Sequence, residues 1–395
     1  MTCAAMAAVA LCGYGLSSTG APAKTARASA VSLNATATPP LPKGNPAEGH
    51  SPQLQQELSG PLTGTGIARP GAAVRMSTSM QAATASAAGT MLNGVDVSCY
   101  QHSNCATYPN GAAINWASVA AGNHFAGIKA TEGNYYTNPY YASDAAAAVA
   151  AGMYVAPYAF ANPFDSTSAG NGTAQQQADF AVQAAAKAQN ATSYKIGGHY
   201  LPIALDIEYD PYASQEGVNT CYGLSTSAMV SWISGFVAEI KAKTGTAPII
   251  YTPQPWWDPC TGNSTAFGGD LLWVPAYSAG TPGTLPAGWN TWTMWQYTSQ
   301  GTVNGINDPS AVDLDYFSGG PQAEQTTVNT AASIQIRTLN ALAGQAVSYT
   351  ATGLPAGVTM SSSGLITGTP TATGTYPVTV TPSSSTAVLP ASVSF

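Results

Sequence analysis

The sequence predicts an α/β fold class, an irregular TIM-like β/α barrel of about eight strands and fewer helices, followed by a small all-β sandwich. Three observations carry this prediction. Short apolar or alternating runs recur along the chain between residues 93 and 317. Helical patterns separate only the earlier runs, and after residue 321 the chain changes to Thr, Ser and Val runs interrupted by Gly and Pro.

The expected barrel strands are short and rich in apolar residues, which is typical of strands buried in a sheet. They cover residues 94–98, 125–130, 153–160, 201–208, 247–252, 271–277, 291–297 and 311–317. Strands that alternate with helices predict a parallel sheet, and about eight such strands in one domain predict a closed barrel.

Helical periodicity lies between the early strands, and the last pattern begins with Ser225 and Thr226 as capping residues. The four expected helices cover residues 114–121, 139–151, 174–189 and 225–243. The later strands follow one another too closely for a full helix between each pair. We therefore expect loops or hairpins between the final strands.

The ends of the chain have a different composition from the barrel, which we place at residues 92–320. Residues 1–30 resemble an export signal, with an apolar Ala-rich stretch followed by Ala28-Ser29-Ala30, which fits a signal-peptidase site. The alternative of a lipoprotein anchored at Cys12 conflicts with the large Leu11 before it. The other expected parts are a disordered Ala, Pro, Ser and Thr-rich linker at 31–91, a second linker at 321–334 and the Ig-like β-sandwich at 335–395.

Composition argues for a secreted, extracellular globular protein. Charged residues make up only 7% of the chain, and the formal net charge is -7. With 11 Lys and Arg spread thinly, the chain has no basic stripe for a phosphate backbone, which argues against nucleic acid as a partner. No stretch after the signal approaches ~20 consecutive apolar residues, so we expect no membrane span. We expect a monomer.

Two of the six cysteines lie in the expected signal, and the other four allow three pairings. Proximity along the chain favours Cys99 with Cys105 and Cys221 with Cys260, as structural disulfides in an oxidising compartment. A metal site is the rival interpretation, but no CxxC motif and no His pair at ligand spacing accompanies them. We predict no metal and no cofactor.

Two carboxylates lie two residues apart at the end of one expected strand. In a strand, Asp206 and Glu208 point to the same side, while Leu205 and Ile207 point to the other. At the C-terminal end of a barrel strand that side opens on the active-site mouth, where paired carboxylates are typical of glycosidases. A salt bridge or a bound cation is the structural alternative.

Further acids lie in the first and last strands, which become neighbours when a barrel closes. Asp96 lies in the first strand and Asp313 in the last, so three strands aim acids at one mouth. Asp315 shares a face with Asp313, and strand geometry alone does not decide between them. Asp210 and Glu132 are candidates for loop capping or substrate contact.

Aromatic residues at the strand ends are candidates for stacking on sugar rings. For each single residue a place in the core is the favoured interpretation, but beside the acids we expect at least some of the set to line a saccharide groove. The expected saccharide contacts are Tyr158, Phe160, Trp273, Tyr277, Trp295 and the adjacent Gln296, with Tyr251 and Tyr297 nearby. Other chemistries fit less well. The chain has no GxSxG, HExxH or GxxxxGK[ST] motif, and its four His residues form no ligand pattern.

Five motifs between residues 93 and 319 together resemble glycoside hydrolase family 25, the Chalaropsis-type N-acetylmuramidases. They read Gly94-Val95-Asp96-Val97-Ser98, Ile128-Lys129-Ala130-Thr131-Glu132-Gly133, Leu201-Pro202-Ile203-Ala204-Leu205-Asp206-Ile207-Glu208, Trp295-Gln296-Tyr297 and Val312-Asp313-Leu314-Asp315. The resemblance implies an irregular β/α barrel. It also implies hydrolysis of the β-1,4 bond between N-acetylmuramic acid and N-acetylglucosamine in bacterial peptidoglycan.

The resemblance also implies roles for the acids. Glu208 matches the family's general acid, and Asp206, Asp96 and Asp313 match the acids around the scissile sugar. Retention of configuration could come from a carboxylate nucleophile or from the substrate's own acetamido oxygen oriented by Asp206, and we favour the second.

Two rival functions stay open. One is a non-catalytic wall-binding protein, and the other is hydrolysis of another N-acetylated glycan such as chitin. The segment 354–370 resembles an Ig-type module of secreted bacterial enzymes, which would bind wall polymer or act as a spacer.

Overall fold

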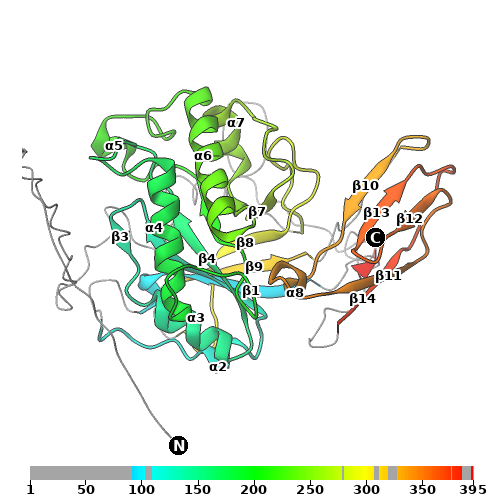
Figure 1. The fold of residues 1–395 in the computed structure, drawn as a ribbon, viewed down its shortest axis with the longest axis horizontal. Helices are drawn as coiled ribbons and strands as arrows, with labels where there is room; N and C mark the ends of the chain where they lie inside the picture. The colour runs from blue at the N-terminus through cyan, green and yellow to red at the C-terminus, as the bar shows by residue number, and fades with distance from the viewer. Residues whose placement is uncertain are drawn as a thin grey trace, which may run out of the picture. The chain divides into compact units, whose positions relative to one another are not determined.

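The structure is a computed structural model, and it describes residues 91–102, 109–277, 280–306, 311–318, 327–374, 376–384 and 393–394. The predicted signal peptide, nearly all of the first linker and Cys105 lie outside the described residues. Figure 1 shows the order of the elements along the chain.

Eight strands form a closed barrel, as the sequence predicts. Seven of them follow one another in the order β1, β2, β4, β5, β6, β7, β8, and each pairs with the next in parallel. The eighth, β9, is antiparallel to both β8 and β1, and these pairings close the barrel. The strands are β1 (Leu92–Val97), β2 (Phe125–Glu132), β4 (Tyr154–Phe160), β5 (Ala204–Asp206), β6 (Ile249–Tyr251), β7 (Leu271–Pro275), β8 (Met294–Gly301) and β9 (Val312–Phe317).

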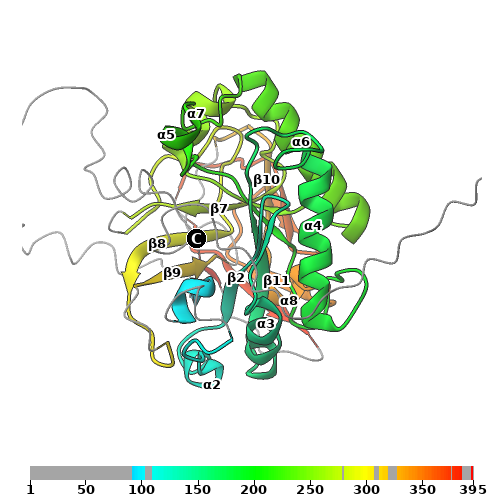
Figure 2. The ribbon, with the colours of Figure 1, turned by 90° about the vertical axis from the view of Figure 1, so that its left-hand side faces the viewer.

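The helices cover one part of the barrel. Figure 2 shows α3, α4 and α6 gathered on one side, with β8 and β9 on the other. The helices and short turns of this part are η1 (Cys99–His102), α2 (Trp116–Val119), α3 (Tyr141–Ala150), α4 (Ala174–Ala186), η3 (Lys187–Gln189), α5 (Ala213–Glu216), α6 (Thr226–Thr244) and α7 (Gln254–Thr261). The short β3 (Tyr136–Thr137) adds a hairpin to β2. The four helices expected from periodicity are all present.

Helix α6 shows how local sequence produces these elements. Ser225 caps it by accepting a hydrogen bond from the backbone N–H of Ala228 at 3.3 Å, and Gly245 ends it in the left-handed region at φ 81°. Its buried side chains recur at helical spacing, so one face packs into the core. They are Met229, Trp232, Ile233, Phe236 and Ile240.

The C-terminal part consists of two three-stranded antiparallel sheets around a core of its own, which confirms the all-β module. Ile366 from one sheet and Tyr349 and Val380 from the other are buried in that core. Strand β10 begins at Ala332, inside the range that the sequence assigned to the second linker. The elements are β10 (Ala332–Gln335), α8 (Leu339–Leu342), β11 (Ser348–Thr352), β12 (Val358–Met360), β13 (Leu365–Gly368), β14 (Thr379–Ser383) and β15 (Val393–Ser394).

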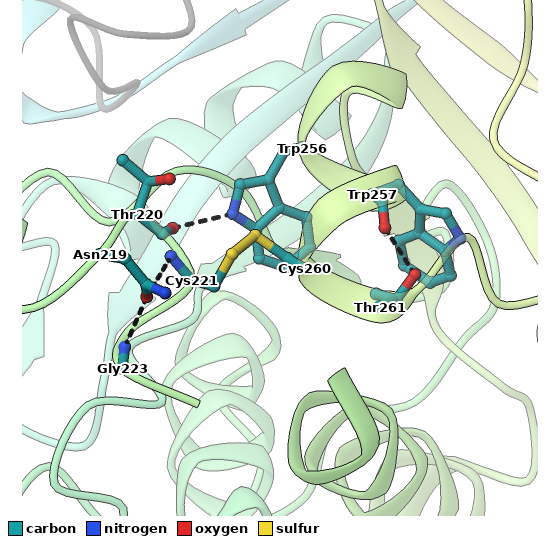
Figure 3. Close-up of a disulfide and its surroundings, with 8 residues drawn as sticks. All are labelled: Asn219, Thr220, Cys221, Gly223, Trp256, Trp257, Cys260 and Thr261. Atoms are coloured by element: carbon teal, nitrogen blue, oxygen red, sulfur yellow. Dashed lines mark hydrogen bonds between the residues drawn. A yellow bond between two sulfur atoms is a disulfide. The ribbon is translucent and has the colours of Figure 1, made fainter. Parts of the chain in front are cut away.

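The predicted Cys221–Cys260 disulfide is confirmed, and it joins the segment after β5 to α7 (Figure 3). Close to it, the indole N–H of Trp256 donates to the carbonyl of Thr220 at 3.0 Å. The disulfide and this hydrogen bond therefore hold the same short segment against α7. The predicted Cys99–Cys105 pair stays a prediction, because Cys105 lies outside the described residues.

Candidate active site

Strand register brings the predicted acids to one end of the barrel. Asp96 in β1 lies directly opposite Asp313 in β9, and both are buried. Asp206 is the last residue of β5, and Glu208 follows two residues later, fully buried. In the parallel strands this is the C-terminal end, where the mouth of a β/α barrel lies.

A pocket opens among these strands, lined by Asp96, Tyr158, Asp206, Tyr251 and Trp273. The lining residues come from five different strands, so their arrangement depends on closure of the barrel. Gly127 leaves the space for Trp273, because a Cβ at this position would overlap the indole ring. Any larger residue at position 127 would displace one wall of the pocket.

Gln296 links three of the side chains at this mouth. Its carbonyl oxygen accepts from the phenols of Tyr251 at 3.0 Å and Tyr277 at 2.7 Å. Its amide N–H donates to Asp96 Oδ2 at 2.8 Å. The two phenol donors fix the orientation of the amide, so its N–H group points at the Asp96 carboxylate.

Asp313 and Asp315, which strand geometry left undecided, have different surroundings. Asp313 lies level with Asp96, whereas Asp315 lies two residues further down β9, opposite Gly94 and Gln296. Asp315 Oδ1 accepts the indole N–H of Trp273 at 2.8 Å. Burial, together with the charges of Asp96 and Asp313, raises the pKa of Asp315 well above its usual range. Asp315 therefore lies deeper in the barrel than Asp313, resists ionisation and supports Trp273.

The pKa values of the tyrosine hydroxyls around the mouth reflect the acidic residues gathered there. Burial raises the pKa of Tyr251 well above 10, with further contributions from Tyr277, Glu208, Asp206 and Asp96. Tyr251 therefore stays a hydrogen-bond donor at neutral pH. The pKa of Tyr222 is raised by burial and then by Asp210, Glu208 and Asp206.

The backbone around Glu208 is held by hydrogen bonds to both neighbouring strands. The N–H of Ile207 donates to the carbonyl of Tyr251 at 3.0 Å, and the N–H of Ala161 donates to the carbonyl of Asp206 at 2.8 Å. Asp210 caps the following turn, since its carboxylate accepts from the N–H of Tyr212 at 2.8 Å. The acid-bearing segment thus leaves the barrel in a defined direction.

The expected saccharide contacts do not all gather at this site. Tyr158, Trp273, Tyr277 and Gln296 lie with the acids, as described above. Phe160 lies in register with Asp206, and the Lys129 ammonium is 4.8 Å from the centre of its ring.

Trp295 lies away from the acids, on the outer side of β8. Successive side chains of a strand point to opposite faces of the sheet. Because Gln296 points into the barrel, its neighbour Trp295 points outward. The Trp295 indole donates to the carbonyl of Ala276 at 2.7 Å and packs against Trp292, Tyr297 and Tyr316. The structure therefore gives Trp295 a packing role.

A buried ion pair next to the mouth escaped the sequence analysis. Lys129 Nζ lies 2.8 Å from Glu132 Oε2, and both side chains are about 2% exposed. In a regular strand, residues three apart point to opposite sides. The register of β2 against β4 shifts between Lys129 and Thr131, and this bulge turns both charged groups to the same side. The sequence signal for this ion pair is the presence of two opposite charges within the motif Lys129-Ala130-Thr131-Glu132.

Within the described ranges, no group of three or more His, Cys, Asp or Glu side chains is arranged to hold a metal ion. None of the helices in the described part is both long and apolar enough to cross a membrane.

A closed barrel with several strands directing carboxylates to one mouth defines the protein as a glycoside hydrolase of the barrel class. The family model of glycosyl hydrolases family 25 matches residues 95–306. The chain belongs to this family. Asp313 lies beyond the matched residues, but β9 places it beside Asp96. A family model of an Ig-like domain matches residues 317–395.

Individual relatives give the same assignment for the barrel. The chain is 37% identical over 230 residues to lysozyme M1 of Streptomyces globisporus, covering 58% of this chain and 68% of the relative. It is 37% identical over 224 residues to the N,O-diacetylmuramidase of Chalaropsis sp, covering 55% and 92%. The crystal structure of the bacterial lysozyme from Streptomyces coelicolor matches with 35% identity, 58% and 93% coverage and a TM-score of 0.48.

Proposed function

We propose that the protein is a secreted peptidoglycan hydrolase that cleaves the β-1,4 bond between N-acetylmuramic acid and N-acetylglucosamine. The observation that carries the proposal is the meeting of Asp206, at the end of β5, and Glu208, two residues later, with Asp96 and Asp313 at one barrel mouth. The names of the relatives, lysozyme and N,O-diacetylmuramidase, support the choice of substrate.

Within this proposal Glu208 is the general acid that protonates the leaving oxygen. A buried carboxyl among other carboxylates is the kind of environment that keeps a proton available for this step. Asp206 orients and stabilises the acetamido group of the substrate, whose oxygen attacks the anomeric carbon. Asp96, fixed by Gln296, and Asp313 complete the negative surroundings of the oxocarbenium-like transition state. Tyr158, Trp273 and Tyr277 bind the saccharide at the same mouth.

The activity is tested with purified protein on suspended bacterial cell walls. We expect falling turbidity and soluble fragments with N-acetylmuramic acid at the new reducing end. Reducing ends of N-acetylglucosamine would contradict the muramidase specificity. Tight binding with unchanged turbidity would favour the wall-binding alternative, and preferential cleavage of chitin would favour the other glycan.

The role of Glu208 is tested with Glu208→Gln, which keeps the shape and removes the transferable proton. We expect kcat to fall by roughly 100- to 10,000-fold with little change in melting temperature. The matched control is Glu239→Gln on α6, where the carboxylate pairs with Lys243 at the surface. Activity of Glu208→Gln within a few-fold of wild type would show that another residue is the acid.

A further inference from the structure

The buried Lys129–Glu132 pair is the centre of a polar network beside the mouth. Glu132 Oε2 receives the Lys129 ammonium at 2.8 Å, and Glu132 Oε1 accepts from the phenols of Tyr135, at 2.9 Å, and Tyr212. Asn162, just after β4, donates its amide N–H to the Tyr135 oxygen at 3.2 Å. The network therefore connects residues that follow three successive strands, β2, β4 and β5.

Stability alone does not account for this pair. Removing two charges from water costs about as much as their attraction returns, so apolar residues of similar size often stabilise a core equally well. A buried ion pair can instead serve to hold another group in a fixed position.

The two phenols belong to segments with different functions. Tyr135 lies in the β2–β3 hairpin, three residues from Glu132 itself. Tyr212 is 80 residues away in sequence and belongs to the segment that leaves β5, only four residues after Glu208. The Tyr212–Glu132 hydrogen bond therefore ties the acid-bearing segment to β2.

We infer that Glu132, held by Lys129, is a positioning residue that fixes Glu208 through the phenol of Tyr212. This inference rests on the proposed role of Glu208 as the general acid. Tyr212 itself is buried, and its backbone N–H donates to Asp210, so the turn between Glu208 and Tyr212 is short and internally bonded. A displacement of Tyr212 is transmitted along this turn to Glu208.

The charge states of Glu132 and Tyr212 favour the hydrogen bond between them. Burial opposes ionisation of Glu132, but the Lys129 charge and the hydrogen bonds from Lys129, Tyr212 and Tyr135 together lower its pKa. Burial and the Glu132 charge raise the pKa of Tyr212 above its usual range. At neutral pH the acceptor is therefore ionised and the donor protonated, which preserves the hydrogen bond between Tyr212 and Glu132.

The experiment compares Tyr212→Phe with Tyr135→Phe in the full chain. Each variant removes one hydroxyl donor from the same oxygen of Glu132, but only Tyr212 lies on the segment of Glu208. We expect kcat on cell walls to fall roughly 10- to 100-fold in Tyr212→Phe, with KM within about 2-fold, because small misplacements of catalytic groups have effects of this size. We expect Tyr135→Phe to keep kcat within about 3-fold.

Two further measurements separate positioning from general structure. The acidic and basic limbs of the kcat–pH profile should move in Tyr212→Phe, because the surroundings of Glu208 change, and should stay in place in Tyr135→Phe. Amide hydrogen exchange at residues 207–212 should accelerate in Tyr212→Phe alone. Both melting temperatures should fall by a similar amount.

Each outcome tests a different claim. Equal kcat values and equal pH profiles in the two variants would overturn the positioning role of Glu132. A wild-type protein that is inert on walls would instead overturn the proposed function. Hydrogen exchange would in that case still test whether Tyr212 holds the segment of Glu208, and equal exchange at residues 207–212 in both variants would overturn that claim.

Discussion

At the residue scale, the neighbours of a carboxyl group decide what it can do, and Asp315 shows this most clearly. It is fully buried, accepts the N–H of Trp273 and lies beside Asp96 and Asp313. Burial and the two neighbouring carboxylates raise its pKa, so it stays protonated where an exposed aspartate is ionised. It supports one wall of the pocket, and its raised pKa opposes the addition of another negative charge to the mouth.

This protonation predicts a pH-dependent effect of Asp315→Asn. In the unfolded chain Asp315 releases its proton near pH 4, whereas the folded protein retains it to higher pH. Rising pH therefore favours the unfolded wild type at this position, and asparagine, which cannot ionise, removes this loss. We expect the melting temperature of Asp315→Asn relative to wild type to increase as pH rises from about 4 to 7. Thermal denaturation at several pH values measures it, and a constant difference would contradict the raised pKa.

The control for this prediction is Asp315→Ala, which removes the acceptor of the Trp273 indole. A buried N–H without a partner costs about 1–3 kcal/mol, and the cavity adds to that loss. We expect Asp315→Ala to be destabilised at every pH, including acidic pH where Asp315→Asn and wild type are alike.

At the scale of elements, the segment between β5 and α6 is held from both ends. Its start is tied to β6 and, through Tyr212, to Glu132, and its end is tied to α7 by the Cys221–Cys260 disulfide. The N–H of Asp210 also donates to the carbonyl of Thr220 at 3.1 Å, which links the two halves. A long connection is thus converted into a rigid support for the acid.

We predict that replacing both Cys221 and Cys260 by serine lowers the free energy of unfolding by about 2–4 kcal/mol. The crosslink spans 39 residues, and its loss gives the unfolded chain more freedom. Urea denaturation of the double variant measures the change, with Ser234→Ala, an exposed position on α6, as the control. An unfolding midpoint equal to that of wild type would show that the segment is held without the disulfide.

The elements were predictable where burial sets the pattern. Apolar runs predicted all eight barrel strands, and periodicity predicted α2, α3, α4 and α6. Helix α7 was not predicted, because its two prolines and two tryptophans obscure any period, although Pro255 near its start is compatible with a helix.

The face of a single side chain was less predictable. In β8 the polar Gln296 points inward and the aromatic Trp295 points outward, the reverse of the usual preference. In β2 a bulge, which leaves no mark in composition, brings Lys129 and Glu132 together. The acids were predictable because barrel closure makes the first and last strands neighbours. Their hydrogen-bond partners depend on contacts between distant residues.

At the scale of the whole molecule, charge is the property that affects the encounter with a wall. Residues 92–395 contain six Lys and Arg against sixteen Asp and Glu. One of the cations, Lys129, is buried, and another, Lys243, is paired with Asp179 at 2.7 Å. Under the proposed function, we expect this net negative charge to repel any wall whose polymers are anionic. We therefore expect affinity for such a wall to come from short-range stacking and hydrogen bonding at the barrel mouth.

This repulsion predicts that salt accelerates the clearing of anionic walls. Raising the ionic strength from about 10 mM to about 150 mM shortens the screening length from about 30 Å to about 8 Å. Weaker repulsion should raise the association rate and therefore the rate of clearing at low wall concentration. Turbidity assays across this range measure it, and walls stripped of their phosphate polymers are the matched control, on which the salt dependence should largely disappear. A rate that falls as salt rises would mean that a cationic surface guides binding, and would contradict the role assigned to the net charge.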